Sequence, residues 1–285
     1  MNPCVKSVKV LSDYQLLIIF TNDEIGLYDC KPLLNFGVFK ELQDIEYFNQ
    51  VSIVGDTVTW VNEQDICPDT LYLESNMVDE ITGIWYELMS DINSGDEFCS
   101  SEKTLVFHFA WRLKDKYRDE IKLDFEKNIF ENNFSGNTWL DLYVILNDEK
   151  IGFEFKFKGN TNTTNTHIDV VHDIKRLSWL KEQKKIDKGY FLYATNSKSA
   201  MNEVCAGGRD RTAHLDFITH HSARYEALEN NKIKYFPKGK TSSTESNETV
   251  AIPHNIIFKW NGIKLDKFKE HVSSGKYAWL TPIII

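Results

Sequence analysis

The chain has 285 residues, of which 42% are hydrophobic and 26% are charged, so it can bury a core in one large or two ordinary domains. No run approaches the roughly 18 apolar residues that a membrane span requires, and the first residues, MNPCVKSVKV, lack the hydrophobic segment of a signal peptide. We therefore expect a soluble protein of the cytoplasm rather than a membrane protein. Five scattered cysteines without a CxxC pair favour reduced, mostly buried thiols over disulfides or a zinc site.

The formal net charge of −9 is unevenly distributed along the chain. Residues 1–75 hold 4 Lys and Arg against 12 Asp and Glu, a net charge of −8, whereas residues 76–285 hold 29 against 30, a net charge of −1. The overall charge therefore neither supports nor excludes nucleic acid as a partner. Basic residues cluster locally in the second part, where they either neutralise phosphates or form a solvated helix face. The residues we consider for phosphate contact are Lys158, Lys175, Arg176, Arg209 and Arg211.

Residues 1–75 have the pattern of a small, acidic α+β module. The runs VKSVKVLSD, YQLLIIFTN, EIGLYDC and VSIVGDTVTWV predict short strands separated by turns, and residues 33–48 predict a short helical segment. The pattern V-x-x-V-x-V-L-x-D-Y-x-L at 5–16 and the ending W-V-N-E-Q-D-I-C-P-D-x-L-Y at 60–72 resemble a small bacterial family of unknown function over about residues 4–74. The resemblance implies a fold and a setting beside toxin–antitoxin or defence-like genes, without catalytic residues. We predict a module that docks a partner protein or dimerises.

Residues 76–285 predict a second domain with α/β layering. Helices are expected at about 77–93 and 101–118, then a hairpin at 138–158, a helix near 168–185 and an apolar strand at 188–196. The chain ends in the apolar run LTPIII, which must be buried as a strand or pair with another chain.

The hairpin carries the candidate site. Strict alternation in IGFEFKFK (151–158) predicts a strand with one buried and one displayed face. With a loop of two or four residues, opposed positions sum to 295 or 297, so Asp141 faces Glu154 or Lys156. These three residues then share the polar face, and opposed Cβ atoms about 4.5–5.5 Å apart allow two carboxylates to bind one divalent cation. Oxygen ligands favour Mg²⁺ or Mn²⁺, and a nearby ammonium suits phosphodiester hydrolysis.

The spacing Asp141, then Glu154-Phe155-Lys156, resembles the core motif of the PD-(D/E)XK nuclease superfamily. The segment HIDVVHDIKRLSWLKEQKKIDKGYFLYATN resembles the stretch after the catalytic strand in uncharacterised restriction-endonuclease-like proteins, so the resemblance covers about residues 98–225. It implies a restriction-endonuclease-like core with a mixed central sheet flanked by helices. It also implies that Asp141 and Glu154 bind Mg²⁺ or Mn²⁺, that the Phe155 carbonyl completes the shell, and that Lys156 assists catalysis.

Three points of the motif stay open. Glu102 suits the glutamate that many members add from the preceding helix, but it also suits a capping-box acid after Ser100 or Ser101. Leu140 precedes Asp141, so the proline-aspartate pair of the motif is missing. The following helix has no glutamine before Gln183; whether His172 or Lys175 acts instead is undecided.

We therefore predict a metal-dependent nuclease in residues 76–285, with DNA as the expected substrate and RNA still open, in restriction or another form of phage defence. Two-fold symmetric cutting would suggest a homodimer. The competing hypothesis is a non-catalytic, nuclease-like interaction protein, such as an antitoxin-like or regulatory partner that binds nucleic acid or protein. His220 and His221 favour a structural or DNA-backbone role over metal ligation, because no partner spacing supports zinc.

Overall fold

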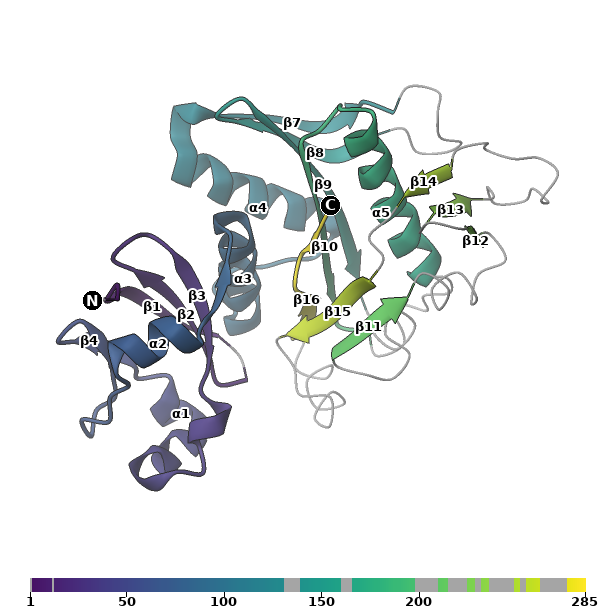
Figure 1. The fold of residues 1–285 in the computed structure, drawn as a ribbon. Coiled ribbons are helices and arrows are strands. Elements are labelled where there is room, and N and C mark those ends of the chain that lie inside the picture. Colours follow the sequence, from purple (N-terminus) through teal and green to yellow (C-terminus); the bar gives the residue numbers. More distant parts are fainter. Residues whose placement is uncertain are drawn as a thin grey trace. The chain divides into compact units, whose positions relative to one another are not determined.

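The computed structural model describes residues 2–11, 13–130, 139–159, 166–197, 210–214, 225–228, 232–235, 249–251, 255–261 and 276–285. The chain forms two compact units, one covering the chain through Glu97 and the other beginning at Phe98 (Figure 1). In the described part of the chain, no helix is long and apolar enough to cross a membrane.

The first unit is built on an antiparallel sheet with the strand order β1-β2-β3-β6. Its strands are β1 (Val5–Leu11), β2 (Gln15–Phe20), β3 (Ile25–Asp29) and β6 (Asn76–Val78), and a separate hairpin pairs β4 (Ser52–Val54) with β5 (Thr57–Thr59). The predicted strands of this module are confirmed. The predicted helical segment at 33–48 is instead a 3₁₀ segment, Gly37–Gln43, followed by α1 (Ile45–Phe48), because Asp44 is extended and caps α1 with its side chain.

Two longer helices complete the first unit, α2 (Pro68–Glu74) and α3 (Glu80–Ser94). Helix α3 is tied to β1, since Lys9 pairs with Asp91 and the Ser90 hydroxyl donates to the Val10 carbonyl at 3.2 Å. The compact unit therefore extends to Glu97, beyond the change in composition near residue 75 from which the sequence analysis divided the chain. Of the cysteines that the structure describes, only Cys30 is buried, so the expectation of mostly buried thiols is wrong.

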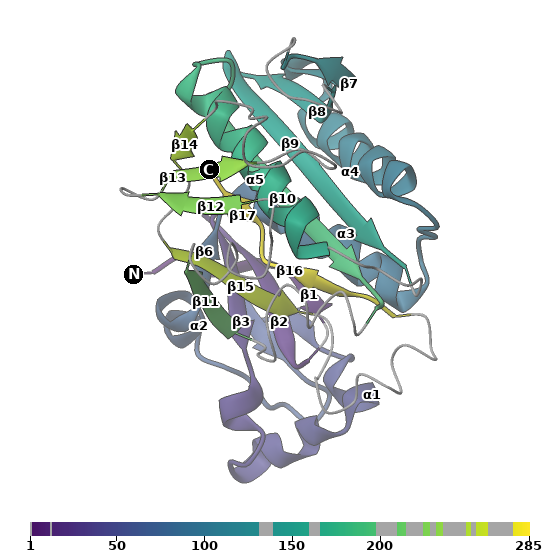
Figure 2. The same cartoon turned by 90° about the vertical axis from the view of Figure 1, so that its right-hand side faces the viewer.

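The second unit is a mixed sheet flanked by helices, with the strand order β11-β15-β16-β10-β9-β8-β7 (Figure 2). Its strands are β7 (Ile121–Asn128), β8 (Trp139–Leu146), β9 (Glu149–Lys158), β10 (Lys188–Thr195), β11 (Asp210–His214), β15 (Asn255–Asn261), β16 (Ala278–Leu280) and β17 (Ile283–Ile284), which also pairs with β10. Strands β9 and β10 are parallel and are joined through α5 (Thr166–Glu182). A small antiparallel sheet contains β12 (Tyr225–Leu228), β13 (Lys232–Tyr235) and β14 (Thr249–Ala251).

Two helices cover opposite faces of β9. Helix α4 (Glu102–Tyr117) lies on the apolar face, where the Phe109 ring contacts Phe153 and Phe155 with centroid distances of 5.4 Å. Helix α5 packs on the other face, which carries Glu154 and Lys156. The alternation predicted for β9 is present, but the expectation that its polar face is displayed to solvent is wrong, because α5 buries it.

The β8–β9 hairpin has the shorter of the two predicted loops. Leu146 pairs with Glu149 and Leu142 with Phe153, so opposed positions sum to 295. The two loop residues, Asn147 and Asp148, have φ values of 50° and 66°, as a tight type I′ turn requires. Continuing this register by one position places Asp141 opposite Glu154.

Two further segments bear on the sequence analysis. Strand β7 was not among the predicted elements, although Ile121, Leu123 and Phe125 alternate with charged residues there. The apolar end of the chain is confirmed as buried strand: β16 and β17 pair with β10, and Ile285 exchanges backbone hydrogen bonds with Gly189. Thr138, Arg209, His220 and His221 lie outside the described residues.

Candidate functional site

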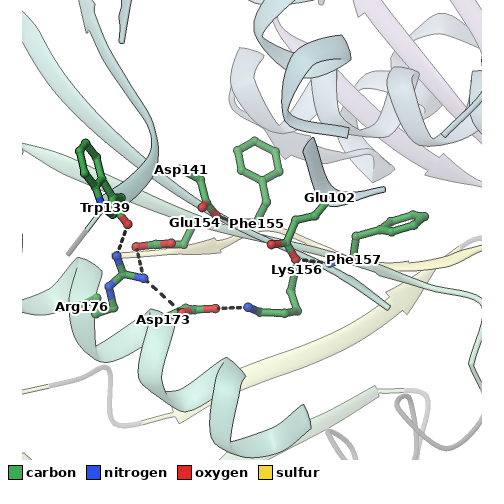
Figure 3. A network of polar contacts seen from close by, with 9 residues as sticks. All are labelled: Glu102, Trp139, Asp141, Glu154, Phe155, Lys156, Phe157, Asp173 and Arg176. Carbon is green, nitrogen blue, oxygen red and sulfur yellow. Dashed lines mark hydrogen bonds and ion pairs between the residues drawn. The ribbon is translucent and has the colours of Figure 1, made fainter. Parts of the chain in front are cut away.

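The site forms where β8 and β9 separate. Backbone pairing between these strands ends at Leu142 and Phe153, while β8 stays paired with β7 as far as Trp139. Beyond that point the Asp141 carboxylate accepts a hydrogen bond from the Phe155 N–H at 2.7 Å (Figure 3). A carboxylate thus replaces the backbone acceptor that the neighbouring strand would have supplied.

Glu102 performs the same task two residues further along β9. Its carboxylate accepts a hydrogen bond from the Phe157 N–H at 3.0 Å. Helix α4 is capped by Ser101, whose hydroxyl accepts from the Thr104 N–H at 3.2 Å, and Glu102 is the first residue of the helix. The two interpretations of Glu102 are thereby separated, because its side chain points to β9 and does not close a capping box.

Glu154 is almost fully buried, with 1% of its surface exposed. Its Oε1 lies 3.1 Å from Nη1 of Arg176, which is itself buried on α5. Nη2 of Arg176 donates to the Trp139 carbonyl, and the guanidinium lies 4.3 Å over the ring of Phe130. The arginine is therefore held on three sides and serves as an internal counter-ion for Glu154.

Lys156 extends from the same face of β9 as Glu154, two residues along the strand. Its Nζ lies 3.0 Å from Oδ2 of Asp173 on α5, and Oδ1 of Asp173 lies 3.6 Å from Nη1 of Arg176. One turn of α5 thus contacts both polar side chains of β9 through the pair Asp173 and Arg176 (Figure 3).

The network contains four carboxylates, those of Glu102, Asp141, Glu154 and Asp173, against two cations, Lys156 and Arg176. Burial is the main cause that raises the pKa of Asp141 to about 6, with Asp173 and Glu102 adding to it and the Phe155 N–H opposing it. Burial also raises the pKa of Glu154 well above its ordinary value, against the attraction of Arg176. The carboxylates are therefore only partly neutralised by the chain itself.

The donors fit a hard divalent cation. Within the described residues, no three His, Cys, Asp or Glu side chains cluster closely enough to hold a metal ion. Mg²⁺, however, is commonly held by one or two carboxylates and several waters. Asp141 and Glu154 come from adjacent strands, and the charge of Asp141 helps to raise the pKa of the buried Glu154. The Phe155 carbonyl lies on the same edge of β9 as its N–H, which faces Asp141.

The basic residues considered for phosphate contact on α5 do not form a solvated helix face. Lys175 and Arg176 are buried within the unit, and Lys158 at the end of β9 is half-buried. Arg211 lies in β11, and for His172 the structure describes only its place in α5. Asp173 was not among the predicted site residues. Its signal was the spacing of three residues from Arg176, which places both side chains on one face of the helix.

Comparison with known proteins assigns only the first unit. Residues 5–76 match a family described as proteins of unknown function (DUF2442). This match confirms the small N-terminal module that the sequence resembled over about residues 4–74. No curated protein and no solved structure matches the chain.

Proposed function

We propose that the second unit is a divalent-metal-dependent phosphodiester hydrolase, with a restriction-endonuclease-like core and DNA as substrate. One observation carries the proposal: Asp141 and Glu154 approach each other from adjacent strands, and Lys156 shares their face of the sheet. This set supplies both the carboxylates for a cation and the ammonium that phosphodiester hydrolysis requires.

The chain's own residues have distinct tasks in this proposal. Asp141, Glu154 and the Phe155 carbonyl would hold Mg²⁺ or Mn²⁺, which when bound supplies Lewis acidity and activates water. Glu102 and Asp141 fix the backbone of β9 by accepting its N–H groups, and so fix the positions of Glu154 and Lys156. The Lys156 ammonium stabilises negative charge on the phosphate as the bond breaks.

The biological setting comes from the first unit. Its net charge of −8 over residues 1–75 makes it a poor surface for nucleic acid, so we assign it to docking a partner protein or a second copy. A nuclease joined to such a module suits restriction or another form of phage defence. Two-fold symmetric cutting of both DNA strands would suggest a homodimer.

The proposal is tested by cleavage of plasmid and unmethylated phage DNA in Mg²⁺ or Mn²⁺. The wild type is compared with Glu154→Gln and Lys156→Ala, and with Glu182→Gln, which removes an exposed carboxylate from α5. The expected result is cleavage by the wild type and the control, loss of cleavage in Glu154→Gln, and a strongly reduced residual rate in Lys156→Ala. Cleavage that survives both substitutions would show a contaminant or another site.

One observation favours the alternative, a non-catalytic protein that binds nucleic acid or another protein. Glu154 already has a buried counter-ion in Arg176, at 3.1 Å, so the site holds together by contacts within the chain. Calorimetric titration with Mn²⁺ separates the two functions. Binding that is lost in Glu154→Gln supports the nuclease, and the lack of binding in the wild type supports the alternative.

A further inference from the structure

The carboxylate of Asp173 lies between the two cations of the site. One oxygen, Oδ2, is 3.0 Å from Nζ of Lys156, and the other, Oδ1, is 3.6 Å from Nη1 of Arg176. The side chain of Asp173 is 6% exposed and that of Lys156 is 16% exposed. Asp173 therefore belongs to the interior of the network, on a helix rather than on the strands that carry the motif.

The contact with Asp173 gives the Lys156 ammonium a fixed partner on α5. Glu102 and Asp141 bind the backbone of β9, and Glu154 is enclosed by Arg176. A lysine ammonium, in contrast, sits on a flexible four-carbon stem and finds no fixed direction from the strand alone. The contact with Asp173 selects one direction, and Arg176 holds Asp173 from its other side.

We propose that Asp173 is a positioning residue that acts through Lys156, by holding its ammonium in place for the reaction. This inference rests on the proposed function. It gives α5 the part for which the sequence analysis had considered His172 or Lys175. Asp173 touches neither substrate nor the reacting atoms in this proposal, so its removal impairs the reaction only while Lys156 is present.

Non-additivity of substitutions tests this dependence. Single-turnover cleavage is measured for wild type, Asp173→Asn, Lys156→Ala, the double variant and the control Glu182→Gln, at saturating DNA and Mn²⁺. We expect Asp173→Asn to lower the rate roughly 10- to 100-fold, as misplacement of a catalytic group does. The KM for DNA and the Kd for Mn²⁺ should stay within about 3-fold, and Asp173→Asn should cost less than about 2-fold in the Lys156→Ala background.

A second measurement follows the lysine itself. The ammonium nitrogen of Lys156 is observed by NMR in protein labelled with ¹⁵N-lysine and is assigned by its loss in Lys156→Ala. An immobilised ammonium in wild type, lost in Asp173→Asn and kept in Glu182→Gln, supports the inference. An unchanged resonance in Asp173→Asn overturns it.

The failures are distinguishable. If the wild type does not cleave in either metal, the proposed function fails and the inference with it. Only the inference fails if the wild type cleaves DNA and Asp173→Asn cleaves it equally fast. The same holds if Asp173→Asn lowers the cleavage rate by the same factor in the Lys156→Ala background as in the wild type. Should Asp173→Asn not fold, Asp173→Glu keeps the charge and displaces the carboxylate. A lowered rate at an unchanged melting temperature then supports the inference, and a wild-type rate overturns it.

Discussion

The Asp141 carboxylate accepts the Phe155 N–H at 2.7 Å, on an edge of β9 where pairing with β8 has already ended. The sheet opens at this point without leaving the strand's amide unpaired, because a side chain substitutes for the missing backbone carbonyl. The opening places Asp141 beside Glu154, and the turn at Asn147 and Asp148 sets the register that brings them together.

Neutralising Asp141 should stabilise the metal-free protein. Its pKa is raised from 3.8 to about 6, so the folded state prefers the protonated form. This contribution to stability is present below pH about 4 and is lost as the pH rises through 6. Asp141→Asn keeps an acceptor for the Phe155 N–H and should raise the free energy of unfolding by about 1–3 kcal/mol at pH 7.5. Urea unfolding of both proteins in EDTA at pH 5 and 7.5 measures this difference in the free energy of unfolding. An equal difference at both pH values would contradict the prediction.

Divalent metal should stabilise the protein, and the effect should depend on pH. A cation that binds only the folded state adds about 2.7 kcal/mol at a concentration 100 times its Kd. Because a protonated Asp141 cannot ligate, the stabilisation by Mn²⁺ should fall as the pH drops below about 6. Thermal unfolding with and without Mn²⁺ tests this. Glu154→Gln should show no metal effect, whereas Glu182→Gln should behave as wild type.

The buried pair of Glu154 and Arg176 should show strong coupling. Arg176→Met leaves Glu154 buried without its counter-ion and should cost about 3–5 kcal/mol. Adding Glu154→Gln should recover a large part of that loss, although the contacts of Arg176 with Asp173 and Trp139 stay missing. Denaturant unfolding of the four proteins in the cycle measures the coupling. Lys181→Met, exposed on the same helix, serves as the control, and additive losses would refute the coupling.

The turn at the end of the hairpin should accept glycine. Asp148 has a φ of 66°, in the left-handed region where glycine has no steric penalty. Asn-Gly is the preferred pair for a type I′ turn, so Asp148→Gly should stabilise the protein by about 0.5–1 kcal/mol. Asp148→Val should destabilise it by a similar or larger amount. The reverse order of stability in denaturant unfolding would show that another turn geometry is present.

Much of the site could be predicted from the sequence, because an even or odd loop length decides which residues of a hairpin share a face. Strict alternation in β9 placed Glu154 and Lys156 on one face, and an even-numbered loop was enough to bring Asp141 to the same face. The choice between sums of 295 and 297 depended on the turn, where Asn147 and Asp148 both adopt left-handed conformations. The strands of the first unit were equally predictable, because local alternation and turn residues define them.

The helix contacts could not be predicted in the same way. Asp173 and Arg176 meet β9 only because α5 crosses the polar face of the strand with one particular rotation, which tertiary packing decides. The composition of α5 suggested a basic surface, whereas Lys175 and Arg176 are buried. Strand β7 could not be predicted because it is an edge strand of the described sheet with several exposed residues, so its apolar alternation is weak.

The backbone contacts of Asp141 and Glu102 have an evolutionary consequence. Both carboxylates hold the backbone of β9, so selection for a stable fold would preserve them in a descendant that had lost cleavage. Glu154 and Lys156 pair instead with side chains of α5, which can be exchanged together with them. In descendants that have lost cleavage, substitutions should therefore appear first at positions 154, 156, 173 and 176. Asp141 and Glu102, which bind the backbone of β9, should persist.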